Sequence, residues 1–266
     1  MGRWRVSDKG VLRAREIAGI IAGASIDELA ELERRYADDP RKQVQAALET
    51  ARRRAGREQR ERSRVEGMYS YQRELSGGGV VMGIDEVGRG AVAGPLTVAA
   101  VVLPEEPLMW GINDSKQLTP ARREALCRRI ERHAVAYGIA HIAPDVIDKR
   151  GMSRCLRMAM AEAIKNAGVE PDCVLIDGNP VHVHPRERCV VKGDAKVACI
   201  AAASIVAKVT RDALMIAYDA EYPEYHLASC KGYASAEHID AIRKLGLSPI
   251  HRASFCGNFV ETLRLF

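Results

Sequence analysis

The chain has 266 residues, of which 47% are hydrophobic and 28% charged, and its formal net charge is +5. This length and composition predict one globular domain with an appendage, and they exclude a protein whose composition is too polar to form a hydrophobic core. The longest uncharged apolar run, residues 90–104, is too short to span a bilayer, so we expect no contact with a membrane and a cytoplasmic location.

The cysteines indicate a reducing compartment. Their number is odd, and no two of them form a Cys-x-x-Cys pair, which argues against a zinc site and against a disulfide framework. We therefore expect reduced, mostly buried thiols at positions 127, 155, 173, 189, 199, 230 and 256.

Residues 1–75 differ from the rest because they are highly charged and contain no convincing strand. Ser25 and Glu28 have the spacing of a capping box, which predicts the start of a helix. Asp39-Pro40 predicts the start of a longer helix that runs to about Arg64. The flexible sequence at 76–79 then marks a domain boundary, so we expect a helical extension over 1–75 and a second domain over 76–266.

The positive charge of the chain is concentrated in this extension. Residues 41–64 contain nine Lys or Arg and three Glu, a charge of +6, and the rest of the chain is close to neutral. Such a stretch can lie along phosphates and add salt-sensitive affinity for nucleic acid, or it can be an ordinary solvated helix. The sequence leaves both interpretations open.

Beyond the boundary, strands and helices alternate, which predicts an α/β fold with a mixed sheet flanked by helices. The first two strands are joined by a short glycine loop and should pair as a hairpin. We expect strands at 80–85, 96–103, 134–142, 173–177 and 189–192, and helices at 119–133, 144–167, 195–220 and from 235 onward.

Four acidic residues lie near the carboxyl ends of these strands, where open α/β sheets bind ligands. They are Asp85, Glu86, Asp177 and Asp194. Carboxylates that converge repel one another, and a divalent cation removes that cost. Two Mg²⁺ or Mn²⁺ ions about 4 Å apart would suit an all-carboxylate site and the cleavage of a phosphodiester.

The loop after the first strand raises two further questions. Neighbouring strand residues point to opposite faces, so Asp85 and Glu86 can share a site only if the backbone turns there, and the glycines at 88 and 90 predict such a turn. The same loop partly matches a dinucleotide fingerprint. A β-branched run follows instead of the required helix, which argues against that interpretation.

Several motifs together resemble bacterial ribonuclease HII, over roughly residues 80–255 and in the order of that family. They are Gly83-Ile-Asp-Glu-Val-Gly-Arg-Gly90 with Ala93-Gly-Pro95, Asp114-Ser-Lys-Gln-Leu118, Ile176-Asp-Gly178, Lys192-Gly-Asp-Ala-Lys196, Ala202-Ala-Ser-Ile-Val-Ala-Lys208, Lys231-Gly-Tyr233 and His251-Arg252. The extension lies outside this match, although some members of the family carry a comparable one.

The resemblance implies a ribonuclease H-like fold and a metal set formed by the four acids named above. It implies that the loop Gly88, Arg89 and Gly90 reads the ribose 2′-hydroxyl, and that Tyr233 packs on the neighbouring deoxyribose. Lys116, Lys192 and Ser204 are expected near backbone phosphates. The implied reaction is hydrolysis 5′ to a ribonucleotide, in RNA/DNA hybrids or in duplex DNA with embedded ribonucleotides, leaving 3′-hydroxyl and 5′-phosphate ends. Nothing in the sequence indicates an obligate assembly, so we expect a monomer.

Two other functions remain as alternatives. A four-carboxylate exonuclease would use the same metal chemistry but would need a free 3′ end. A non-catalytic nucleic-acid-binding module would depend on the basic helix alone. Deletion of residues 1–75 would separate the module from the nuclease, because the nuclease should keep its metal-dependent activity.

Overall fold

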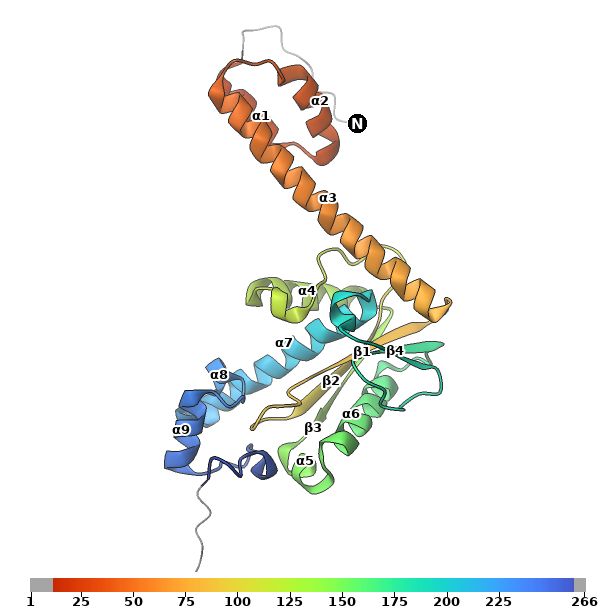
Figure 1. Ribbon diagram of the computed structural model, residues 1–266, viewed down its shortest axis with the longest axis vertical. Coiled ribbons are helices and arrows are strands. Elements are labelled where there is room, and N and C mark those ends of the chain that lie inside the picture. Colours follow the sequence, from red (N-terminus) through yellow and green to blue (C-terminus); the bar gives the residue numbers. More distant parts are fainter. Residues whose placement is uncertain (1–11, 261–266) are drawn as a thin grey trace, which may run out of the picture. The chain divides into compact units, whose positions relative to one another are not determined.

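The computed structural model describes residues 12–260, and it divides the chain into two compact units, one ending at Arg64 and the other beginning at Val65 (Figure 1). The helix α3 (Lys42–Ser76) contributes to both units. The division falls before the glycine joint expected at 76–79. The assignment of 1–75 and 76–266 as the two domains stays a prediction.

The first unit is helical, as expected. α1 (Ala14–Gly23), α2 (Ile26–Tyr36) and the start of α3 enclose a small core formed by Ile17, Ile21, Leu29, Val44, Leu48 and Ala51. The predicted capping box is present, because the Glu28 N–H donates to Ser25 Oγ at 3.3 Å and the Ser25 N–H donates to Glu28 Oε2 at 2.9 Å.

The prediction that the long helix ends near Arg64 was wrong, since α3 continues to Ser76. Its last three turns supply Val65, Met68 and Tyr69 to the core of the second unit. Two hydrogen bonds join these turns to that unit: the Met109 N–H donates to the Tyr69 hydroxyl at 3.0 Å, and the Cys199 N–H donates to Gln72 Oε1 at 2.9 Å. The charge pattern of the sequence does not reveal this change of environment along one helix.

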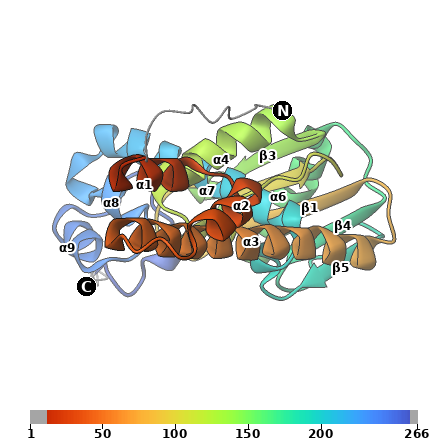
Figure 2. The ribbon, with the colours of Figure 1, turned by 90° about the horizontal axis from the view of Figure 1, so that it is seen from above.

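The second unit contains a five-stranded mixed sheet in the order β3-β2-β1-β4-β5. Figure 2 shows β3 and β5 at opposite edges with β1 between them. The hairpin of β1 and β2 is antiparallel, as predicted, and β1 pairs in parallel with β4. The strands are β1 (Val81–Val87), β2 (Leu96–Val102), β3 (Ala136–Ile142), β4 (Cys173–Asp177) and β5 (Glu187–Val190).

Helices cover both faces of the sheet, so β2 is buried along its whole length. α4 (Pro120–His133) and α7 (Ala198–Glu221) pack on the face that carries Ala99 and Val101. α5 (Pro144–Arg150) and α6 (Met152–Ala167) pack on the face that carries Val98 and Ala100. In Figure 1, α7 and α6 lie on either side of the strands.

Two predicted helices differ from the structure in ways that matter for the site. The expected helix 144–167 is broken into α5 and α6 at Gly151, which has φ +77°. The expected helix from residue 195 begins only at Ala198, because residues 193–195 form the separate 3₁₀ turn η2 (Gly193–Ala195). That turn carries Asp194.

Smaller helices complete the second unit, and all of them except η1 surround a separate core that includes Met215, Tyr225 and Ile242. They are the 3₁₀ turns η1 (Ser115–Gln117), η3 (Pro223–Tyr225) and η4 (Ala253–Phe255) and the helices α8 (Leu227–Cys230) and α9 (Ala236–Leu245). Throughout residues 12–260, no helix combines the length and the hydropathy needed to cross a bilayer.

Candidate active site

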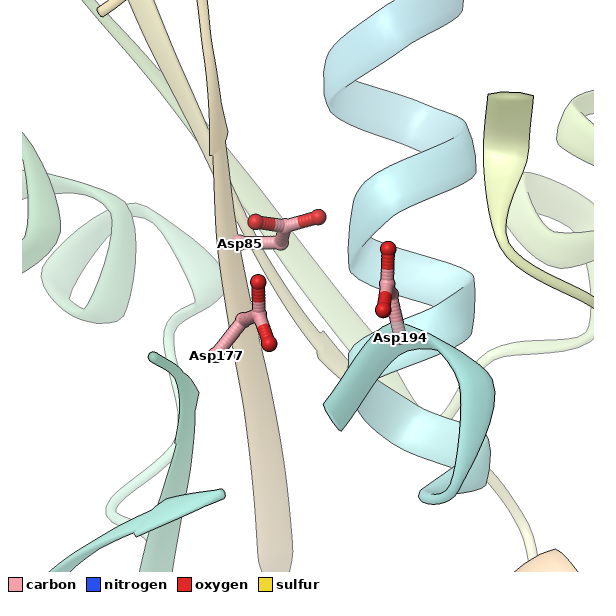
Figure 3. Close-up of side chains that lie close together, drawn as sticks. All are labelled: Asp85, Asp177 and Asp194. Atoms are coloured by element: carbon pink, nitrogen blue, oxygen red, sulfur yellow. The ribbon is translucent and has the colours of Figure 1, made fainter. Parts of the chain in front are cut away.

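Three carboxylates from separate parts of the second unit converge at the centre of the sheet (Figure 3). Asp85 lies on β1, Asp177 ends the neighbouring parallel strand β4, and Asp194 lies in η2. One oxygen of each lies within 4.8 Å of the others. The structure thus brings together residues that are far apart in the sequence, since Asp85 and Asp194 are 109 positions apart.

The approach of α7 to β1 helps to create this arrangement. A side chain at Gly83 would place its Cβ 2.2 Å from the carbonyl carbon of Cys199, so only glycine lets the start of α7 lie directly against the strand. η2, which immediately precedes α7, is thereby held beside the acids of β1 and β4.

A tight turn after β5 joins Asp177 to Asp194. Lys192 adopts the left-handed conformation with φ 57°, and the following Gly193 N–H donates to Asp177 Oδ1 at 2.6 Å. A Cβ at Gly193 would lie 2.6 Å from Ile200 Cδ1, so a larger residue here would have to displace that side chain. The turn therefore fixes the Asp177 carboxylate and presents the adjacent Asp194 to it.

Asp85 is the most deeply buried of the three, with 7% of its surface exposed. Its Oδ1 accepts the Glu86 N–H at 2.7 Å, and the Ser204 hydroxyl also hydrogen-bonds to the carboxylate. Burial raises the pKa of Asp85 well above its usual value, and the charges of Glu86 and Asp177 raise it further. The Oγ atoms of Ser204 and the buried Ser115 lie 3.0 Å apart, and this hydrogen bond holds the Ser204 hydroxyl in place.

Glu86 does not belong to the group of three. β1 continues through it to Val87, with Asp85 opposite Ala99 and Glu86 opposite Val98, so the two acids lie on one regular strand. The turn that the glycines predicted follows Val87, where Gly88 has φ +83° and the Ala91 N–H donates to the Gly88 carbonyl at 3.3 Å, and it does not bring Glu86 into the group of three. Burial raises the pKa of Glu86, and the charge of Asp177 also raises it, which shows that Glu86 is still within electrostatic reach of the cluster.

Charged residues in the loop at η1 lie close to Asp194, and one of them, Asp114, was not predicted as a site residue. Burial is the main cause that raises the pKa of Asp194. The negative charges of Asp114 and Asp177 raise this pKa further, whereas the positive charge of Lys116 lowers it. Lys116 is exposed, and it follows Asp114 in the loop at η1. The expected phosphate-binding lysine is therefore close enough to influence the carboxylate cluster.

The donor set fits a divalent cation. The ionised form of a buried carboxylate in such a group is unfavourable, because each carboxylate loses its water and gains a neighbour of like charge. Oxygen-only ligands of this kind suit Mg²⁺ or Mn²⁺ better than they suit a softer metal. Through residues 12–260, this is the one group of His, Cys, Asp or Glu with the spacing of metal ligands.

Two fully buried arginines hold the glycine loop beside the cluster. Arg211 on α7 donates from Nε, Nη1 and Nη2 to the carbonyl oxygens of Pro95, Lys231 and Ala93 at 2.9, 2.7 and 3.0 Å. Gly88 has φ +83°, and a Cβ there would lie 2.2 Å from Arg211 Nε. The loop can therefore lie on the guanidinium only because its first residue is glycine.

Arg252 acts in the same way on the far side of the loop. It donates from Nε and Nη2 to the Gly94 carbonyl at 3.0 and 2.8 Å, and from Nη1 to the Arg89 carbonyl at 3.2 Å. Arg252 belongs to a sequence motif to which no role was assigned, and Arg211 was not identified from the sequence. The available signal was a single arginine within a small-residue helix that is buried on much of its circumference.

The other expected substrate residues surround this centre. Tyr233 is 38% exposed, and its ring lies 5.6 Å from the guanidinium carbon of Arg211. Arg89 is exposed, with its Nη1 3.5 Å from Glu86 Oε1, and Gly90 follows it at the surface. Lys192 is exposed on the turn before Asp194, and Ser204 is buried beside Asp85. Their contacts with a substrate stay predictions.

Comparison with protein families gives two adjoining matches. The model described as Ribonuclease HII matches residues 82–258, and the model described as Ribonuclease HII N-terminal domain matches residues 14–76. The first covers the carboxylate cluster, both buried arginines and Tyr233. The second covers the helical extension, which confirms that some proteins of this kind carry a comparable region.

Individual relatives agree with the family matches. A ribonuclease HII of Listeria monocytogenes is 45% identical over 224 residues, which is 84% of this chain and 86% of the relative. The crystal structure of ribonuclease H2 from Pyrococcus horikoshii superposes with a TM-score of 0.57 at 29% identity, covering 65% of this chain and 92% of the other. A Bst ribonuclease HIII in complex with Mn²⁺ shares the fold, with a TM-score of 0.56 at 18% identity and 66% of each chain covered.

Proposed function

This chain belongs to the ribonuclease HII family, and from that premise we propose that it nicks nucleic acid on the 5′ side of a ribonucleotide, leaving 3′-hydroxyl and 5′-phosphate ends. The chain is an endoribonuclease that acts on nucleic acid. The proposed substrates are RNA/DNA hybrids and duplex DNA with embedded ribonucleotides, and the proposed active form is a monomer. The observation that carries the proposal is the convergence of Asp85, Asp177 and Asp194.

Divalent cations complete the proposed centre. Asp85, Asp177 and Asp194 would hold two Mg²⁺ or Mn²⁺ ions, with Glu86 as a fourth carboxylate on the edge of the group. When bound, such a pair supplies an activated water and neutralises the charge on the leaving oxygen of a phosphodiester. The raised pKa of Asp85 supports this assignment, because a cation would relieve the cost of keeping that buried group ionised.

The protein's own contribution is to choose and hold the strand. The backbone at Gly88, Arg89 and Gly90 is proposed to approach the ribose 2′-hydroxyl, which distinguishes RNA from DNA at one nucleotide. The exposed ring of Tyr233 is proposed to pack against the next deoxyribose. Both elements depend on the buried Arg211, which supports Gly88 from beneath and lies against the Tyr233 ring.

Lys116, Lys192 and Ser204 are proposed to contact the backbone phosphates on either side of the cut. Lys116 and Lys192 are exposed on the two loops that flank Asp194, so both can reach an incoming strand. Ser204 is different, because it is buried against Asp85 and Ser115. Its proposed contact requires the phosphate to reach the floor of the site.

A closed circular duplex with one ribonucleotide tests the proposal. Incubation with Mg²⁺ or Mn²⁺ should produce one nick at the 5′ side of the ribonucleotide, and end mapping should show a 3′-hydroxyl. A four-carboxylate exonuclease would leave the circle intact, since it needs a free end. An all-DNA circle is the matched control, and cleavage of that control at a comparable rate would contradict the proposal.

A further inference from the structure

A pair of buried histidines lies beneath Tyr233, and no step of the proposed reaction uses it. His238 on α9 is fully buried, and His251 is 5% exposed. Their Nε2 atoms lie 3.1 Å apart, and the ring centroids are separated by 5.2 Å. Two imidazole nitrogens at this distance share one proton, so one must donate and the other must accept.

The backbone at each end of the pair determines which nitrogen carries the proton. The Ser248 N–H donates to His251 Nδ1 at 3.0 Å, so Nδ1 of His251 must be unprotonated and its proton lies on Nε2. That proton is donated to His238 Nε2, which leaves the proton of His238 on Nδ1. His238 Nδ1 lies 2.9 Å from the Tyr233 carbonyl oxygen, which can only accept.

The hydrogen-bond chain therefore runs in one direction, from Ser248 through His251 and His238 to Tyr233. It is satisfied only while both rings are neutral, because a second proton on either ring would oppose a donor already in place. Burial lowers the pKa of both histidines, that of His251 to about 4. The other titratable groups that face the pair are Tyr225, whose ring lies against both, the Cys230 thiol at 3.5 Å from His238 Nδ1, and His226.

The segment that contains His251 also holds the glycine loop. His251 forms an isolated β-bridge with Ala93, and the Arg252 N–H donates to the Val92 carbonyl at 2.8 Å. The N–H groups of Val92 and Ala93 donate to the Gly232 carbonyl at 2.9 and 3.1 Å. Gly232, which precedes Tyr233, and His251 are thus both bound to the segment Val92–Ala93.

We propose that His238 and His251 are positioning residues that set the place of Tyr233 relative to the Gly88–Gly90 loop, and thereby the selectivity for a single ribonucleotide followed by DNA. The inference rests on the proposed function, since it assigns Tyr233 to the deoxyribose after the ribonucleotide. His238 fixes the Tyr233 backbone, and His251 connects that bond to the segment beneath the loop. Neither histidine touches the substrate.

The protonation pattern is tested directly on the unaltered protein. Two-dimensional NMR of ¹⁵N-labelled protein at neutral pH distinguishes the three forms of each of the seven histidines, with His238→Asn and His251→Asn spectra used for assignment. The expected result is a neutral His238 protonated at Nδ1 and a neutral His251 protonated at Nε2. The opposite tautomer of either ring, or a cationic ring, would overturn the proposal.

The functional part is tested by a double-mutant cycle between His238 and Tyr233. kcat/KM is measured for a duplex with one ribonucleotide and for an RNA/DNA hybrid. His238→Leu should lower kcat/KM on the first substrate about 10-fold more than on the second, within the range caused by a misplacement of about 1 Å. In a Tyr233→Ala background the same change should have no further selective effect.

Matched variants separate positioning from a general loss of structure. His238→Asn keeps a donor near the Nδ1 position and should retain most of the selectivity, and His226→Asn alters an exposed neighbour and should behave as the unaltered protein. Equal losses of His238→Leu on both substrates, or effects that simply add to those of Tyr233→Ala, would overturn the proposal. If the unaltered protein nicks neither substrate, the proposed function itself fails, whereas the NMR result still decides the protonation pattern.

Discussion

The carboxylate cluster and the loop platform beside it use buried polar groups in opposite ways. In the cluster, burial and like charges raise the pKa values of Asp85 and Asp194. In the platform, which consists of Arg211, Arg252, His238 and His251, each donor nitrogen described above has a carbonyl or imidazole acceptor within 3.2 Å. We therefore expect a bound cation to stabilise the cluster and to leave the platform unchanged.

This difference separates the two tasks of the site. Carboxylates whose negative charge is not balanced by the protein bind a cation more strongly, because the cation offsets the unfavourable free energy of burying that charge. Groups that position the loop proposed to contact the ribose gain by being rigid before the substrate arrives, since ordering them later would reduce affinity. The same comparison predicts that changes in the two regions affect stability in opposite directions.

The largest expected effect is that of Asp85→Asn on catalysis. This change removes a charge from the centre of the cluster, so activity should fall by at least about 100-fold, the loss that follows even when an outer partner of a metal ligand is disturbed. In the absence of metal the variant should be more stable than the unaltered protein, because a neutral amide replaces a buried charge. Cleavage assays and thermal unfolding with and without Mg²⁺ measure both effects.

Asp145→Asn is the matched control, since Asp145 lies on the surface of α5 and pairs with Lys149 at 2.9 Å. It should change neither the activity nor the response of the unfolding temperature to Mg²⁺. A lower metal-free stability of Asp85→Asn would show that the Asp85 carboxylate is compensated by the protein alone, and the comparison between the two regions would fail.

Sequence patterns were sufficient for the centre of the fold. The hairpin, the strand at 173–177 and the helix after Thr119 are confirmed, because their signals are local: apolar runs, β-branched residues and caps. The convergence of Asp85, Asp177 and Asp194 also followed, since strand ends that share one edge of a sheet bring their residues together.

The platform could not be predicted, because its interactions are not local. Arg211 donates to carbonyls more than a hundred residues earlier in the chain, and nothing in the sequence around it indicates those partners. His238 and His251 each look like ordinary helix or loop histidines until the fold places their rings together. The position of Glu86 relative to the other acids likewise depended on how far β1 continues, because the turn at Gly88 and Gly90 begins only after Val87.

The end of α3 provides the next largest effect. Deletion of 1–64 should leave the second unit folded, whereas deletion of 1–75 removes the buried Val65, Met68 and Tyr69 and should destabilise it by more than about 4 kcal/mol. The longer deletion also leaves the Cys199 N–H without its acceptor on Gln72. Chemical denaturation of both forms measures the difference, and equal stabilities would contradict the assignment of these turns to the second unit.

A change in the platform should have a smaller effect that is opposite in sign to that of Asp85→Asn. Arg252→Lys keeps the positive charge but removes the planar guanidinium that donates hydrogen bonds to both the Gly94 and the Arg89 carbonyls. The free energy of unfolding should therefore fall by about 2 kcal/mol with or without metal. Activity should fall with it, because the loop loses its support. The exposed Arg243→Lys is the control, and a stability gain in Arg252→Lys would contradict the role of the platform.

The smallest effect is a pH dependence with opposite signs in the two regions. The folded-state pKa of His251 is lowered from its usual value to about 4, so the unfolded chain takes up a proton first as the pH falls. The contribution of this residue is complete above its usual pKa and is lost as the pH falls toward 4, by at most about 3 kcal/mol. The raised pKa values of Asp85 and Asp194 act in reverse, because without metal the folded cluster binds protons more tightly than the unfolded chain.

Comparison of variants isolates the two contributions. Denaturation between about pH 8 and pH 4 without metal should show that His251→Asn loses less stability on acidification than the unaltered protein, because it has no ring to protonate on unfolding. Asp85→Asn should lose more, since it lacks the carboxylate whose protonation favours the folded state. Parallel pH profiles for all three proteins would mean that neither region differs from the unfolded chain in proton binding, and the contrast between cluster and platform would not hold.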